Sequence, residues 1–223
     1  MTIEKAYLSF VNLVNRNLTN NNVNVDKPRF VLLFNDIQNR YLEWLLEKRN
    51  EDSIRYATLL LTVDKKLNLE QKESDKDFYN LPEDYFDLAN LKVEASKDKC
   101  KKVSLHCFEV KSEDTQELLN DKYNEPSFDY RETFYMTSSN STVAVFKSNF
   151  SIDNVYATYY RYPTQIDIEG YINEQNTQSQ SIDPEWDDKA VGRILVAMSK
   201  EFAAINSDGG QYELGADRLF KSI

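Results

Sequence analysis

The sequence predicts an α+β fold, in which a bundle of N-terminal helices and one C-terminal helix is combined with a central antiparallel β-sheet or sandwich. Three observations predict it. Apolar residues recur every three or four positions in the first sixty residues, they alternate with polar residues through the middle of the chain, and the helical period returns after residue 180. With 223 residues, 41% of them hydrophobic, the chain can bury a substantial core.

The N-terminal part is expected to form three helices. Thr2 can cap the first helix, and Asp26 followed by Pro28 is typical of the start of the second. A third helix is expected around residues 52–61. The second helix carries the longest apolar stripe, which indicates packing of helix on helix; its members are Phe30, Phe34, Ile37, Tyr41 and Trp44.

The middle of the chain is expected to form an antiparallel sheet of about five or six strands, with one short helix inserted at 114–123. "KDK" joins two alternating segments as a hairpin turn, and "SN" joins two others. The expected strands are 65–72, 86–96, 100–110, 132–138, 141–148 and 150–163.

The last helix is predicted to begin with Asp183 as its cap and Pro184 in its first turn. The expected organisation is therefore N-terminal helices at 1–64, a β-rich portion at 65–180, a C-terminal helix that returns to the bundle at 181–210, and a tail at 211–223.

The charge balance bounds the partners of the chain. Its formal net charge is -10 and its sequence pI is about 4.8, which disfavours tight binding to nucleic acids or to anionic membranes, because phosphate contacts need clustered Lys or Arg. No apolar run approaches the roughly 18 residues that span a bilayer. The charged N-terminus does not resemble a signal peptide.

The chain lacks the usual signatures of catalysis and metal binding. It has five glycines and no glycine-rich phosphate loop, and its single histidine, His106, lies in a predicted strand. Cys100 and Cys107 are expected on opposite faces of that strand, so neither a mutual disulfide nor a zinc site is expected. The acid pairs Glu83–Asp84 and Asp187–Asp188 are interpreted as solvated surface and helix-start charge. We therefore expect no catalytic residue, metal or cofactor.

Two aromatic segments are more informative. In "FYNLPEDYFDL" (78–88), Pro82 removes a backbone donor, and the segment is interpreted as an apolar corner between the helices and the first strand. In "VYATYYRYP" (155–163), Val155, Ala157 and Tyr159 share one face of a strand, while Tyr156, Tyr160 and Tyr162 share the other. Because Tyr and Arg are enriched at interfaces, both a core strand and a subunit interface remain open for the second segment.

The order of these pieces resembles the head-to-tail connector proteins (adaptors, or neck rings) of tailed bacteriophages, in particular the ring proteins of crAss-like and other short-tailed phages. The resemblance covers nearly the whole chain and is carried by patterns: Leu81-Pro82-x-Asp84-Tyr85, Tyr160-Arg161-x-Pro163 and Asp183-Pro184. No single pattern is diagnostic, and their order and spacing carry the resemblance.

This resemblance implies a protein that performs no chemistry. Copies, typically twelve, form a ring under the portal protein, extend the DNA channel, and offer a platform for other neck or tail proteins; DNA passes through without specific binding, and no membrane is involved. It implies a virion location at the portal vertex after synthesis in the host cytoplasm. The C-terminal tail often reaches the portal in this class, which makes the docking candidates Tyr212, Leu214, Arg218, Leu219 and Phe220.

The interface candidates are Tyr156, Tyr159, Tyr160, Arg161 and Tyr162, because exposed Tyr and Arg would gain burial on assembly. A different class of function also remains open. In that alternative the chain is a tail-associated carbohydrate-binding or glycoside-hydrolysing protein, with an aromatic platform built from Tyr159, Tyr160 and Tyr162.

Overall fold

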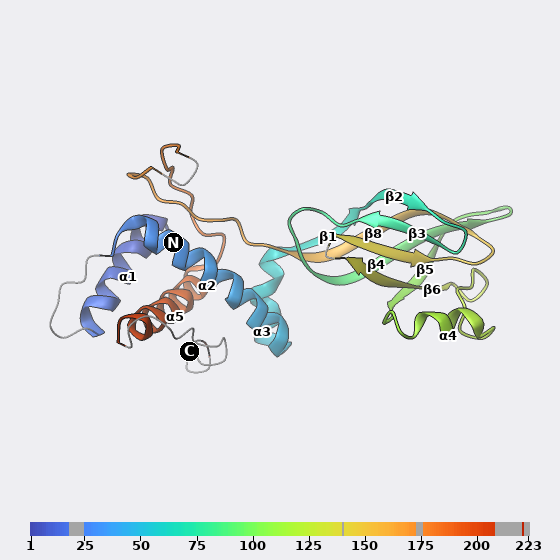
Figure 1. The fold of residues 1–223 in the computed structure, drawn as a ribbon, viewed down its shortest axis with the longest axis horizontal. Helices are drawn as coiled ribbons and strands as arrows, with labels where there is room; N and C mark the ends of the chain where they lie inside the picture. The colour runs from blue at the N-terminus through green and yellow to red at the C-terminus, as the bar shows by residue number, and fades with distance from the viewer. Residues whose placement is uncertain (18–24, 140, 173–175, 208–219, 221–223) are drawn as a thin grey trace. The chain divides into compact units, whose positions relative to one another are not determined.

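The computed structural model describes residues 1–17, 25–139, 141–172, 176–207 and 220 (Figure 1). Its fold is α+β, as the sequence predicts. The chain divides into a helical unit, residues 1–59 and 163–223, and a sheet unit, residues 60–162. The sheet unit is thus inserted in the sequence of the helical unit, and residues 163–180 belong with the helices instead of with the β-rich portion to which the sequence assigned them.

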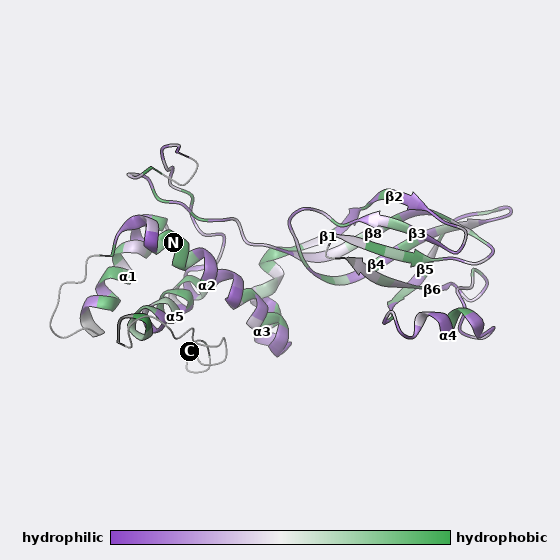
Figure 2. Cartoon of the chain, viewed as in Figure 1, coloured by the Kyte–Doolittle hydropathy of each residue, from purple (hydrophilic) through white to green (hydrophobic). Residues whose placement is uncertain are grey.

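The helical unit is built from amphipathic helices: α1 (Ile3–Asn17), α2 (Lys27–Lys48), α3 (Glu51–Ala57) and α5 (Asp188–Ser207), with the 3-10 turn η1 (Thr58–Leu60) after α3. Both α1 and α2 pack against α5. Hydrophobic and hydrophilic residues alternate around these helices (Figure 2), as the predicted stripes require. The buried stripe residues include Ile3, Phe10, Phe30, Phe34, Ile37, Tyr41, Val191, Ile194, Met198 and Phe202.

The predicted cap of the last helix is wrong. Helix α5 begins at Asp188, and the Asp187 carboxylate accepts the Ala190 N–H at 2.7 Å. Asp183 instead accepts the Ile3 N–H at 2.7 Å, at the start of α1. Trp186, which lies between Asp183 and the helix, is buried with its indole N–H bonded to Gln38 on α2. A carboxylate can cap any helix start that lies close enough, so sequence order alone does not choose the helix.

A buried amide fixes the segment after the sheet unit onto α2. Gln38 accepts the indole N–H of Trp186 at 3.2 Å, and its own amide N–H groups donate to Asn35 Oδ1 at 2.9 Å and to the Thr164 carbonyl at 3.2 Å. The Asn35 side chain also exchanges two hydrogen bonds with the backbone of Ile166, at 2.9 and 3.1 Å. These bonds explain why residues 163–180 belong to the helical unit.

The sheet unit contains one eight-stranded sheet in the order β1-β8-β4-β5-β6-β7-β3-β2. All neighbouring pairs are antiparallel except β5 and β6, which are parallel, so the predicted antiparallel sheet is corrected to a mixed one with more strands. The residues 110–131 between β5 and β6, which include α4 (Thr115–Asn120), bring the chain back to start β6 in the same direction as β5. The strands are β1 (Leu61–Lys66), β2 (Asn68–Lys72), β3 (Lys76–Asn80), β4 (Tyr85–Lys97), β5 (Cys100–Glu109), β6 (Glu132–Ser139), β7 (Thr142–Phe146) and β8 (Ser151–Arg161).

The two edge strands of this sheet follow each other along the chain. β1 pairs with β8 at one edge and β2 pairs with β3 at the other, and only Leu67 separates them. The Leu67 N–H donates to the Val155 carbonyl on β8 at 2.9 Å. The sheet therefore curls until its edges meet at Leu67. The sequence predicted one strand at 65–72, which the structure divides at Leu67 into the end of β1 and β2. It did not predict residues 61–64 of β1, because Leu61 ends the helical stripe of the third predicted helix.

Two apolar clusters hold the sheet unit together. The larger one lies inside the curl and includes Leu67, Leu91, Val93, Val143, Val155 and Tyr159. The smaller one lies where α4 covers part of the sheet, with Leu118 and Leu119 packed against Phe134 and Phe146. The inserted helix was predicted, and its apolar residues explain why it stays on the sheet.

The corner at residues 78–88 lies within the sheet unit and not between the helices and the first strand. Tyr79 and Leu81 are buried in the larger cluster, and Tyr85 and Leu88 pack against it. The segment connects β3 to β4 across the end of the curled sheet. The sequence prediction was wrong here because it did not recognise β3, which ends at Asn80, one residue before the Leu81-Pro82 step.

Replacing Leu67 tests the closure of the sheet. We expect Leu67→Ala to lower the free energy of unfolding by about 2–4 kcal/mol, because it removes a buried side chain at the meeting point of both edges. Leu69→Ala is the matched control; Leu69 is 44% exposed on β2, and we expect a change within about 0.5 kcal/mol. Urea denaturation followed by circular dichroism measures both. Equal effects of the two substitutions would contradict the closure.

Candidate subunit interface

The two family-like segments, 81–85 and 160–163, meet in space although they lie far apart in the sequence. The Asp84 carboxylate accepts the Tyr159 hydroxyl at 2.8 Å, and the Asp84 carbonyl accepts the Tyr162 N–H at 2.8 Å. Both segments lie at the end of the sheet where β8 stops before Pro163. We call this arrangement of residues 81–86 and 159–162 the sheet-end joint.

Local sequence explains the shape of the joint. Pro82 has no N–H, so the β3 ladder ends with the Leu81 N–H, which donates to the Ser141 carbonyl at 2.7 Å. The Tyr85 N–H donates back to the Pro82 carbonyl at 3.1 Å, which turns the chain into β4. This tight turn places Asp84 beside the last residues of β8.

Aromatic rings pack on both sides of the joint. Tyr85 and Tyr159 have ring centroids 6.1 Å apart, toward the core. Phe86 and Tyr162 form a T-shaped pair with centroids 4.9 Å apart. Sequence reasoning did not single out Phe86, although its position beside Tyr85 in an alternating strand places it on the opposite face from Tyr85.

The joint separates the predicted interface residues into buried and accessible ones. Tyr159 is only 2% exposed, so it has almost no surface to offer a partner. Tyr156, Tyr160 and Arg161 are half-buried, and Tyr162 is 46% exposed. The core-strand interpretation therefore describes one face of β8, and the other face stays partly accessible.

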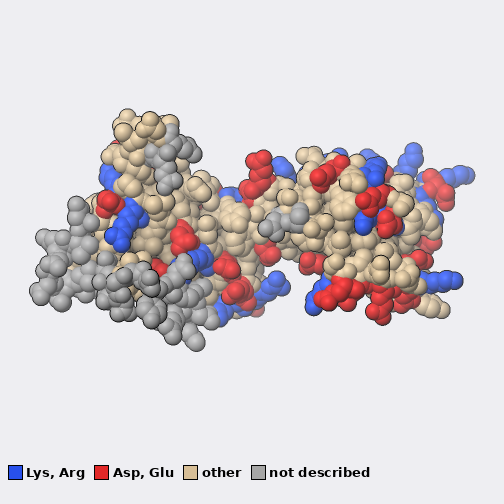
Figure 3. Space-filling view, viewed as in Figure 1, with Lys and Arg blue, Asp and Glu red and all other residues tan. Residues whose placement is uncertain are grey.

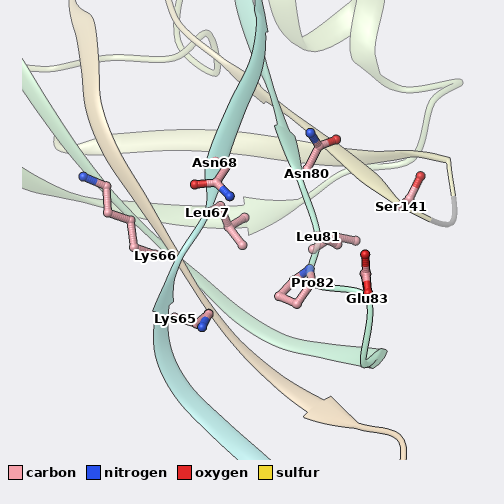
Figure 4. A pocket seen from close by; sticks show the side chains of 9 residues that line it. All are labelled: Lys65, Lys66, Leu67, Asn68, Asn80, Leu81, Pro82, Glu83 and Ser141. Atoms are coloured by element: carbon pink, nitrogen blue, oxygen red, sulfur yellow. The ribbon is translucent and has the colours of Figure 1, made fainter.

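A pocket of about 430 Å³ opens beside the joint (Figure 4). The pocket exists because the pairing of β2 with β3 ends at Asn68 and Asn80. The preceding residues of β1, Lys65 and Lys66, therefore have no strand partner on this edge. Leu67 and Leu81 form its apolar floor. The pocket is lined by Lys65, Lys66, Leu67, Asn68, Asn80, Leu81, Pro82, Glu83 and Ser141. These residues can both donate and accept hydrogen bonds with a peptide backbone or a small polar ligand.

The thiol and imidazole groups lie elsewhere in the sheet unit. Cys100 is exposed at the hairpin end of β5, Cys107 is buried, and both thiols are free. Burial raises the pKa of the Cys107 thiol. Within the described ranges, no group of three or more His, Cys, Asp or Glu side chains is arranged to hold a metal ion. In the same ranges, no helix is long and apolar enough to cross a bilayer.

The predicted portal-docking residues are mostly not placed by the structure. Tyr212, Leu214, Arg218 and Leu219 lie outside the described residues. Phe220 is described and is buried in the helical unit, with its ring centroid 5.1 Å from Tyr41 and 5.4 Å from Trp44. The sequence found no core position for Phe220. The available signal was the long apolar stripe of α2. Its aromatic pair, Tyr41 and Trp44, extends the stripe beyond the length that packing against the other predicted helices requires.

No protein-family model matches this chain, and no curated protein is significantly similar to it. Hydrogen bonds hold both segments of the sheet-end joint in place, and one aromatic side chain, Tyr162, stays exposed there. An exposed and well-held tyrosine is suited to contact with another protein surface.

Removing the Tyr159 hydroxyl tests the joint. We expect Tyr159→Phe to lower the free energy of unfolding by about 1.5–3 kcal/mol, because it breaks a bond to a charged acceptor and leaves Asp84 without that donor. Tyr156→Phe, on the same strand but on the accessible face, should change it by less than about 0.5 kcal/mol. Chemical denaturation of both variants and the parent gives the comparison, and no loss in Tyr159→Phe would contradict the joint.

Alkaline pH should destabilise the sheet unit. Burial is the main cause that raises the pKa values of Tyr79, Tyr85, Tyr135 and Tyr159, and the Asp84 carboxylate adds to the effect at Tyr159. Because the folded-state pKa values exceed the unfolded value of about 10, their stabilisation is complete below pH 10 and is lost as the pH rises further. The Cys107 thiol acts likewise from about pH 8.5.

Tyrosinate absorbance at 295 nm, recorded with circular dichroism from pH 8 to 12, checks this expectation. These four tyrosines should ionise only together with unfolding, because their pKa values are raised in the folded sheet unit. Complete ionisation of all tyrosines in a folded protein would disprove it.

Proposed function

We propose that this chain is a structural subunit of an oligomeric ring that joins the portal to the tail in a tailed bacteriophage. The single observation that carries the proposal is the sheet-end joint. The two segments that most resemble connector proteins, 81–85 and 160–163, come together there through the Asp84 carbonyl and the Tyr162 N–H. The resemblance therefore concerns one structural element and not two unrelated patterns.

In a ring, each copy contacts the next one head to tail, and the rotation between successive copies closes the ring. Each subunit therefore needs two different surfaces that are complementary to each other. The face of β8 that carries Tyr156, Tyr160 and Tyr162 is one candidate surface. Tyr162 is 46% exposed and is held by Phe86 and by the backbone bond to Asp84. A pre-ordered tyrosine loses little conformational freedom on assembly, which favours binding.

The carbohydrate-binding alternative has weaker support. A platform of Tyr159, Tyr160 and Tyr162 needs three accessible rings, and Tyr159 is buried with its hydroxyl bonded to Asp84. The same bond engages the Asp84 carboxylate of the Glu83–Asp84 pair. Glu83 and Asp84 are also adjacent in sequence and point in different directions. Their carboxylates therefore do not face each other across a cleft, as the two catalytic carboxylates of a glycosidase must.

The proposed partners follow from this role. Copies of the chain form the ring, twelve in number as the resemblance implies, and the ring contacts the portal protein on one side and other neck or tail proteins on the other. DNA passes through without specific binding, which agrees with the net charge of -10. The proposed location is the neck of the virion.

Negative-stain microscopy and mass photometry of the full chain, alone and mixed with a portal protein from the same genome, test the proposal. We expect annular particles or decorated portals. Tyr162→Ala should weaken assembly by roughly tenfold, as the loss of an interface tyrosine does. Leu32→Ala, which removes a 61% exposed side chain from α2, is the control for loss of an exposed apolar group.

A chain that stays monomeric, ignores the portal and binds glycans would reject the ring and support the alternative. Equal weakening by both substitutions would remove the accessible face of β8 from the interface.

A further inference from the structure

The hairpin between β4 and β5 concentrates positive charge in a strongly acidic chain. Four of the six residues from 97 to 102 are lysines, whereas the whole chain has a net charge of -10. Lys97 pairs with Asp129, with 3.2 Å between Nζ and Oδ2. The ammonium groups of Lys99, Lys101 and Lys102 make no ion pair with any residue that the structure describes, and all three residues are exposed.

The backbone of this hairpin tip is well defined. Asp98 and Lys102 have left-handed backbone conformations, with φ of 54° and 55°, which produce a tight turn and a bulge. The Lys102 N–H donates to Ser96 Oγ at 3.1 Å, and Ser96 in turn donates to the Asp153 carboxylate on β8. The lysines thus project from a turn that is tied to the neighbouring strand.

A different surface of the same unit is acidic and carries two nearly free tyrosines. Tyr123 is 91% exposed and Tyr130 is 76% exposed, more than any other large apolar or aromatic side chain among the described residues. Asp121 accepts the Tyr123 N–H at 3.0 Å, which holds the backbone of Tyr123 in place. We call the exposed surface of residues 111–131 the α4 face; its exposed acids are Glu113, Asp114, Glu117, Glu125 and Asp129, which outnumber its exposed bases Lys111, Lys122 and Arg131.

The Lys97–Asp129 ion pair joins the base of the tip to the segment that follows α4, whereas the tip itself and helix α4 lie apart. Figure 1 shows the β4–β5 loop reaching outward at the end of the sheet, whereas α4 lies along one side of it. In Figure 3, acidic residues gather on that side and basic side chains project from the far end. A cationic projection and an anionic, tyrosine-bearing face on one chain are complementary surfaces of the kind that head-to-tail assembly requires.

We propose that the lysine-bearing tip of the β4–β5 hairpin docks on the α4 face of a second copy of this chain. Lys99, Lys101 and Lys102 meet the acids around α4, and Tyr123 and Tyr130 supply the aromatic area that becomes buried. The inference rests on the proposed ring and specifies one of its contacts. The partner is a second copy because the chain itself carries both halves of the complementary pair.

Charge exchange tests this contact directly. The tip variant is K99E/K101E/K102E, and the face variant is E113K/E117K/E125K, which leaves the backbone bonds of Asp121 intact. Each variant alone should self-associate at least about tenfold more weakly than the parent in sedimentation velocity, because like charges then face each other. An equimolar mixture should recover association, since in alternating order every reversed tip meets a reversed face. The variant with all six substitutions should recover as well.

The matched control is K5E/K72E/K189E, which makes the same charge change on exposed lysines of α1, β2 and α5. It should associate as the parent does. Circular dichroism confirms that every variant is folded, which is expected because all the altered side chains are exposed. The absence of rescue in the mixture, a loss in the control equal to that in the tip variant, or a parent chain that does not self-associate would each overturn the inference. Annular particles or portal decoration by the tip variant would overturn it too, while leaving the ring itself supported.

Discussion

The sheet unit depends on one constraint, which is that residues 61–72 supply both edges of an eight-stranded sheet. An open sheet exposes two rows of unpaired backbone groups, which invite pairing with other chains. Here the edges are consecutive in sequence and meet at Leu67, whose N–H bonds to Val155 on β8. The short part of β1 that remains unpaired carries a bulge at Asp64, with φ of 51°, and two exposed lysines, Lys65 and Lys66, which are features that discourage further pairing.

Closure determines where the aromatic residues go. Because β8 lies between β1 and β4, the face of β8 that carries Val155, Ala157 and Tyr159 lies inside the curl, and the opposite face remains accessible. Asp84 then connects the end of β8 to the turn before β4. A tyrosine-rich strand thus serves two purposes: one ring completes the core, and its neighbours form an accessible aromatic surface.

The electrostatics of the chain are local as well as global. The net charge of -10 describes an average, and it conceals a hairpin tip with three lysines that lack ion pairs among the described residues. The sheet unit therefore presents surfaces of opposite sign, and copies of one chain that repel at long range can attract where these surfaces meet. The same unit offers the exposed Tyr123 and Tyr130, so burial and charge would act together in such a contact.

The sequence by itself determined the elements whose signals are local. The stripes of α1, α2 and α5, the Asp26 cap and the hairpins 85–109 and 132–146 follow from periods and turn residues within a few positions of each other. Only the tertiary structure decided which helix Asp183 caps, that β5 and β6 run parallel, that β1 and β2 close the sheet, and that Asp84 binds Tyr159, 75 residues away. The physical reason is that a cap, an edge or a hydrogen bond can be satisfied by any group that arrives close enough in space. Which group arrives depends on the packing of the whole chain, and a periodic pattern carries no record of it.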